Sequence, residues 1–136
     1  MSWRSDLVAR LRGDATLAGL LGTRIAFFEA ARGWGSTLPQ LVLQEVSVTR
    51  EHTHSSGHDG LDEVRVQFDI YAAGGVAAGS VEAALLAELE QEAVTQGSTR
   101  FGYGFLQDRG MSTEDMGDGS RAQRLRMDFQ FFHETV

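Results

Sequence analysis

Apolar residues recur at helical spacing in two stretches of this chain. Over residues 3–21 they return every three or four positions, which predicts an N-terminal helical segment. Gly13 and Asp14 interrupt it, and Asp14 is suited to cap a second short helix that ends before Gly22. Residues 77–94 form the second stretch, with one apolar stripe, a glutamate-rich face and Ser80 as the expected N-cap.

Strict alternation of apolar and polar residues is typical of strands that are buried on one face. It predicts strands over 64–71, 101–105 and 125–131. A short apolar run predicts a further strand over 24–28, and an alternation that shifts phase predicts one over 41–48. The apolar phase changes within 41–48, so we expect a bulge at Gln44-Glu45. Two helical segments among these strands predict an α+β fold, a mainly antiparallel sheet with both helical segments packed on one face.

Two polar segments separate pairs of these strands. Residues 50–62 and 109–121 are rich in Gly, Ser and Asp, so we predict long hairpin loops there. The 136 residues match the size of one compact domain, and we expect a single domain over 1–136.

Composition removes several classes of function. The chain has no cysteine, which excludes disulfides, a thiol nucleophile, a thiolate zinc site and an iron–sulfur cluster. The net charge of −7 argues against duplex DNA as a tight ligand, because binding to the phosphate backbone needs a basic surface. Apolar runs are too short for a membrane span and no signal peptide opens the chain, so we expect a soluble protein that stays in the cell that makes it.

The densest group of possible metal ligands lies in the first polar segment. His52, His54 and His58 stand close to Asp59 and Asp62, and three imidazoles with a carboxylate suit Zn²⁺ or Ni²⁺. The segment is also rich in Ser and Gly, which is typical of a solvated hairpin tip without the packed surroundings that a metal site needs. We favour the hairpin tip and predict no metal and no cofactor.

Other signs of chemistry are weak. The acidic residues around 114–119 lack the ligand spacing of a calcium loop, and no serine stands in a G-x-S-x-G context. Phe101, Tyr103 and Phe105 suit a stacking platform for single-stranded nucleic acid, but the acidic composition favours core residues instead. We therefore predict that the protein is not an enzyme.

Four segments of the chain together resemble a known family. A helix end rich in leucine and glycine runs into an Arg-Ile strand, and a Pro-led strand follows. Further along, a strand ends in tyrosine before the long helix, and an Arg-rich strand closes the chain. These segments are 7–25, 38–43, 64–72 and 124–131. In this arrangement the chain resembles the tail terminator, or tail completion, proteins of long-tailed phages, prophages and gene transfer agents.

The resemblance implies a structural role without catalysis. Members form a hexameric ring that caps the tail tube and meets the head-side connector, while DNA passes through the lumen without specific binding. Such a protein is in the bacterial cytoplasm during assembly and then at the head–tail junction of the particle. We expect adjacent copies to pair through their sheets or loops, with the two polar segments directed toward the tube or the connector. The interface residues expected on this basis are Arg50, His52, His54, His58, Asp59, Arg109, Met111, Met116 and Asp118.

Three alternatives stay open at the level of sequence. One is a head–tail connector or stopper component, which would bind the portal side and not the tube subunits. A second, of a different class, is a small metal-binding enzyme that uses His52, His54 and His58. The third is a host-encoded, ring-forming binding domain unrelated to phage.

Overall fold

Three α-helices and a seven-stranded sheet make up the computed structural model, which describes residues 2–30, 32–35, 37–53, 57–117 and 119–136. The helical elements are α1 (Trp3–Gly13), α2 (Ala15–Leu21), the short 3-10 helix η1 (Arg32–Trp34) and α3 (Gly75–Leu89). The strands are β1 (Ile25–Phe27), β2 (Gln40–Thr53), β3 (Gly57–Ala72), β4 (Ala93–Gln96), β5 (Thr99–Gly102), β6 (Phe105–Asp115) and β7 (Arg121–Thr135). The α+β fold is confirmed.

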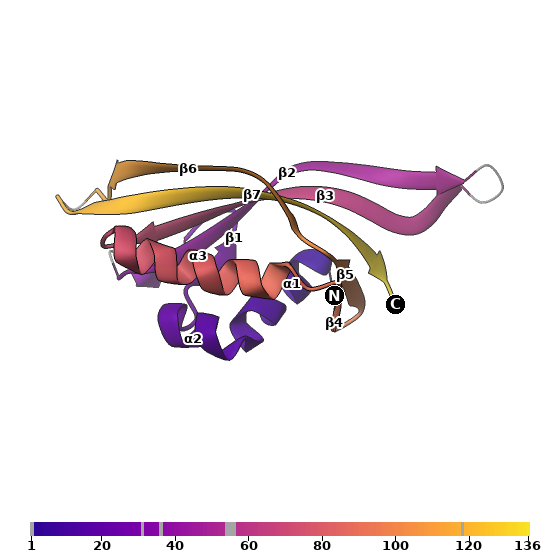
Figure 1. Cartoon of the computed structure of the whole chain (residues 1–136), viewed down its shortest axis with the longest axis horizontal. Helices are drawn as coiled ribbons and strands as arrows, with labels where there is room; N and C mark the ends of the chain where they lie inside the picture. The colour runs from indigo at the N-terminus through magenta and orange to yellow at the C-terminus, as the bar shows by residue number, and fades with distance from the viewer. Residues whose placement is uncertain (1, 31, 36, 54–56, 118) are drawn as a thin grey trace.

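The strands follow the order β1-β2-β3-β7-β5-β4, and β6 pairs with β7 beside β5. All pairings are antiparallel except that of β1 with β2, so the sheet is mixed. The helices all lie on one face of the curled sheet (Figure 1). The core fills the space between these two layers, where the rings of Phe68 and Phe129 meet edge to face at 5.3 Å.

Helix boundaries follow local capping. Asp14 caps α2 as expected, accepting a hydrogen bond from the Leu17 N–H at 2.9 Å, and α2 ends at Gly22 with a positive φ. The prediction for Ser80 is wrong, because α3 already begins at Gly75 and the Ser80 hydroxyl donates to the Val76 carbonyl inside the helix.

The third helix is also shorter than predicted. It ends at Leu89, and residues 93–96 form strand β4 instead. Val94 lies opposite Phe101 in the β4–β5 pair, so pairing within the sheet overrides a sequence that suits a helix.

The bulge of β2 falls slightly later than predicted. The register with β3 shifts between Glu45 and Ser47, which leaves Val46 without a partner in that pair. The shift places Val48 opposite the buried Val64, on the face that carries the core.

The two segments predicted as long loops are mostly strand. β2 continues to Thr53 and β3 starts at Gly57, while β6 runs to Asp115 and β7 starts at Arg121. Backbone pairing with a neighbouring strand requires no apolar side chains, so these polar sequences extend the sheet.

The strand predicted over 101–105 is two strands. β5 ends at Gly102 and β6 begins at Phe105, with a crossing of the chain over the end of α3 between them. There the Gly104 N–H donates to the Leu89 carbonyl at 2.7 Å, and a Cβ on Gly104 would lie only 2.9 Å from that oxygen. The glycine thus permits an approach of two backbones that separates the two strands.

Candidate assembly surfaces

The face of the sheet turned away from the helices is polar and ion-paired. Along β3 and β7, every second side chain points to this face, and most of the described ones are charged or amides, whereas the core residues lie between them and point to the other face. Ion pairs between strands join Arg65 to Asp128 at 3.1 Å, Arg124 to Asp69 at 3.1 Å and Arg126 to Asp108 at 3.0 Å. Glu63 and Glu114 add carboxylates to it, so negative charge exceeds positive charge along these strands.

The two long hairpins, β2–β3 and β6–β7, extend toward opposite ends of the sheet (Figure 1). Leu61 of β3 pairs with Glu134 near the end of β7, whereas Ala72 pairs with Gln123 near its beginning. The described ends of β2 and β3, at Thr53 and Gly57, therefore extend past the end of β7, and the end of β6 at Asp115 lies at the far end of the sheet.

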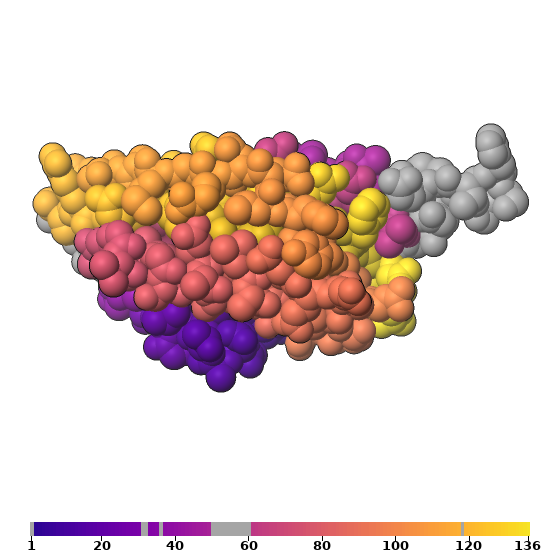
Figure 2. All heavy atoms as spheres, in the orientation of Figure 1, coloured from indigo at the N-terminus to yellow at the C-terminus, as the bar shows by residue number. Residues whose placement is uncertain are grey.

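Three of the interface residues predicted from sequence belong to β6 and the turn after it. Arg109 is exposed and forms an ion pair with Glu82 of α3 at 2.7 Å, which ties β6 to the helix beside it on the face shown in Figure 2. Met111 is exposed on the same strand. Met116 lies just after β6, where its N–H donates to the Ser120 carbonyl at 2.9 Å.

The remaining predicted residues belong to the β2–β3 hairpin and to the β6–β7 turn. Arg50 pairs with Asp62 in the strand register, and His52 pairs with His58 beyond a shift of that register. Asp59 is part of β3. His54 and Asp118 lie outside the described residues, as do the side chains of the other four, so the metal-site alternative stays a hypothesis.

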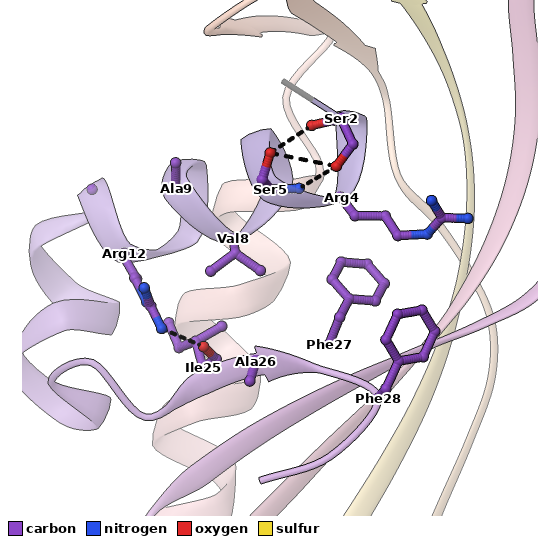
Figure 3. Close-up of a pocket in the computed structure, with 11 residues that line it drawn as sticks. Ser2, Arg4, Ser5, Val8, Ala9, Arg12, Ile25, Ala26, Phe27 and Phe28 are labelled. Atoms are coloured by element: carbon purple, nitrogen blue, oxygen red, sulfur yellow. Dashed lines mark hydrogen bonds between the residues drawn. The ribbon is translucent and has the colours of Figure 1, made fainter. Parts of the chain in front are cut away.

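Sequence reasoning missed a groove between α1 and β1. It has a volume of about 810 Å³ and lies at the β1 edge of the sheet. Figure 3 shows Val8 of α1 and Phe27 of β1 pointing into the space between the two elements. Arg12 spans the groove from α1 and donates to the Thr23 and Ile25 carbonyls at 3.1 and 2.8 Å.

Phe28 forms the outer wall of this groove in a strained conformation. Its φ is +73°, in the left-handed region that costs a residue with a Cβ roughly 1–2 kcal/mol. Its side chain is 60% exposed although its N–H is held by the Leu43 carbonyl at 2.7 Å. The backbone thus holds a large aromatic side chain in solvent, which is the reverse of what burial favours. A run of two phenylalanines at a strand end is the only sequence signal for it.

A second apolar surface lies at the opposite edge of the sheet, where β6 begins. Phe105 and Leu106 are 54% and 37% exposed there, beside Tyr103 and the acidic residues Glu90 and Glu92. The prediction that Phe105 is a core residue is therefore wrong, because the break at Gly104 moves it to the edge of the sheet.

Tyr103 is fixed in this second surface by a hydrogen bond. Its hydroxyl donates to a Glu90 carboxylate oxygen at 3.0 Å, and this bond raises the pKa of the phenol above its ordinary value.

Neither a metal cluster nor a membrane helix occurs in the parts of the chain that the structure describes. Their His, Asp and Glu residues include no group of three placed to hold a metal ion. None of their helices has the length and apolar character to cross a bilayer.

Comparison with known proteins decides the family. The sequence profile of tail completion protein gp17 matches residues 5–134. The chain belongs to this tail completion family. A solved structure titled "Virion of native gene transfer agent (GTA) particle" contains a similar fold, with a TM-score of 0.68 and 20% sequence identity over 96% of this chain and 93% of that chain. No curated protein matches the sequence.

Membership gives this tail completion protein a structural role in a phage-type tail. Its surfaces therefore matter for contacts with other tail or virion proteins, and the two apolar surfaces and the polar sheet face are the features available for them.

Proposed function

We propose that this tail completion protein is a ring-forming tail terminator, which caps the tail tube and joins it to the head-side connector. The observation that carries the proposal is the pair of unlike apolar surfaces at opposite edges of one sheet. A contact between two different surfaces of the same chain generates a ring when the rotation closes. The number of six copies rests on the resemblance to hexameric tail terminators.

In this ring the polar face of the sheet lines the channel and the helices lie on the outside. Ion pairs keep most charges on that face matched, and the excess of carboxylates repels the phosphate backbone of passing DNA. The channel would then let DNA slide without binding it.

The opposite ends of the sheet supply two different docking regions. With the polar face toward the channel, the described strands of the β2–β3 hairpin and of the β6–β7 hairpin extend toward opposite ends of the ring. One end meets the tube and the other meets the connector. The protein would thus end as part of the particle, at the head–tail junction, after assembly in the bacterial cytoplasm.

A binding assay distinguishes the terminator from a connector or stopper component. Purified protein is mixed separately with tail-tube subunits and with the portal-side connector, and complexes are separated by size. A terminator binds the tube subunits and stops their polymerisation. Binding only to the portal side would favour the connector.

The channel assignment has its own test in assembled particles. Replacing Asp108, whose side chain is exposed beside Arg126, by Arg reverses one charge on the polar face in every copy. We expect slower DNA ejection, because the added cations attract phosphates. The control is Ala83→Arg together with Ala87→Arg, at two exposed positions of α3 on the helix side, which changes the net charge by the same amount. Equal ejection rates for wild type and Asp108→Arg would contradict the assignment.

A further inference from the structure

We propose that the groove between α1 and β1 of one copy receives the surface around Phe105 and Leu106 of the next copy. The inference rests on the proposed ring and assigns its two contact surfaces. The first is called the groove, formed by Val8, Ala9, Arg12, Phe27 and Phe28. The second is called the edge patch, formed by Glu90, Glu92, Tyr103, Phe105, Leu106 and Gln107.

Charge on the two surfaces is complementary. Arg12 donates only to backbone carbonyls, so its positive charge has no carboxylate partner among the described residues. In the edge patch, Glu90 accepts only the Tyr103 hydroxyl, and Glu92 makes no ion pair within the described chain. A contact between the surfaces brings these unmatched charges of opposite sign together, which favours this pairing over groove against groove.

Apolar side chains on both surfaces need cover. The Phe28 ring lies in solvent although its backbone is strained. Strained residues of this kind concentrate at functional sites, such as the contact with a partner. Leu106 and Phe105 supply a matching apolar surface in the edge patch. Aromatic anchors that are buried on assembly carry much of the energy of such contacts.

The sheet register places the two surfaces at nearly the same height along the strand direction. Leu106 pairs with Phe129 across β7, and the register continues through Val66 to Glu45 on β2. On β1, Phe27 pairs with Leu43, only two residues along β2 from Glu45. Successive copies therefore join with little displacement along the axis, and such a contact closes into a ring instead of climbing into a filament.

Cysteine cross-linking tests the pairing directly, because the natural chain has no cysteine. Ala9→Cys marks the groove and Gln107→Cys marks the edge patch. Under mild oxidation with diamide, in the presence of tail-tube subunits, the double variant should give a ladder of disulfide-linked oligomers. Each single variant should stay uncross-linked, since neither surface meets itself.

A charge exchange gives independent evidence. Arg12→Glu should weaken assembly about tenfold or more, because it places like charges together. Adding Glu92→Arg to that variant should restore assembly. Val76→Asp, at a side chain that is 89% exposed outside both surfaces, is the control and should assemble normally.

The outcomes separate the two proposals. If hexamers form but no disulfide-linked oligomers appear, and if Arg12→Glu does not weaken assembly, the pairing of the two surfaces is overturned. The proposal of a ring then still stands. Cross-linking of a single variant to itself would also overturn it. A wild-type chain that stays monomeric with tail-tube subunits would overturn both.

Discussion

Gly97 occupies the turn between β4 and β5, where two independent features exclude a larger residue. Its φ is +59°, and a Cβ at this position would overlap the Asp6 carboxylate. That carboxylate is buried and accepts the Thr99 hydroxyl at 2.7 Å, so it is not free to move aside. Gly97→Ala should lower the free energy of unfolding by about 2–3 kcal/mol, measured by chemical denaturation.

Gly79→Ala is the matched control for that substitution. Gly79 lies within α3, where an added Cβ meets nothing within 4 Å. Alanine should therefore raise the free energy of unfolding by about 0.5–1 kcal/mol. Equal effects of the two alanines would contradict the packing described around Gly97.

His133 makes stability depend on pH. It is buried, stacked on Trp3 with ring centroids 4.7 Å apart, and its Nε2 has no hydrogen-bond partner. Burial lowers the pKa of this imidazole below its ordinary 6.5, against an opposing effect of Asp62. The unfolded chain thus binds the proton first, so stability falls as pH drops through the interval between 6.5 and the lower folded-state pKa.

The variant His133→Phe isolates this effect. It removes the titrating group and keeps an aromatic ring against Trp3. Between pH 7 and pH 5 the wild type should lose more of its free energy of unfolding than the variant, as measured by denaturation at each pH. Parallel stability curves would show that His133 does not titrate on unfolding.

A substitution of Phe28 tests whether its strained backbone conformation serves assembly. Phe28→Asn should stabilise the monomer by roughly 1 kcal/mol, because asparagine tolerates a positive φ better than phenylalanine. The same variant should assemble less well, since the exposed ring is lost. Thermal unfolding of the monomer and native mass with tail-tube subunits give the two readouts, and a variant that lost stability yet assembled fully would contradict both.

At the level of elements, a buried ion pair joins two helices of the helical layer, α1 and α3. Arg10 of α1 is buried and donates to Glu88 of α3 at 2.8 Å, while its guanidinium lies 5.4 Å from the centre of the Phe101 ring. Arg10→Ala removes the charge pair, the cation–π contact and the packing of the side chain. It should lower the free energy of unfolding by about 3 kcal/mol.

An exposed pair provides the comparison. Arg109 and Glu82 join β6 to α3 near the surface, where solvent weakens the interaction. Arg109→Ala should change the free energy of unfolding by less than about 1 kcal/mol. Similar losses for both arginines would contradict the difference in burial.

Element boundaries show what the sequence could predict. The helix cap at Asp14 and the alternation in β3 depend on residues that are close in the sequence, so both could be predicted. The extents of β2 and β6 depend on backbone pairing with distant strands, which side-chain polarity does not record. Val94 is likewise part of β4 because it pairs with Phe101 of β5, and not because of its own sequence neighbours.

At the level of the whole molecule, the assembly surfaces were the least predictable feature. Phe105 looked like a core residue because it alternates with Phe101, and only the crossing at Gly104 moves it to the sheet edge. The groove joins residues of α1 and β1, and no local pattern marks such a contact. The two polar segments were predicted as long hairpin loops from their composition, but most of each is strand.

Native mass spectrometry of the tag-free protein, alone and with its tail-tube subunit, is the most direct test of the ring. The structure offers two complementary surfaces per copy, so every copy in a closed ring uses both. We predict a hexamer, either alone or once tube subunits are added. A protein that remains monomeric in both conditions would contradict the tail-terminator proposal.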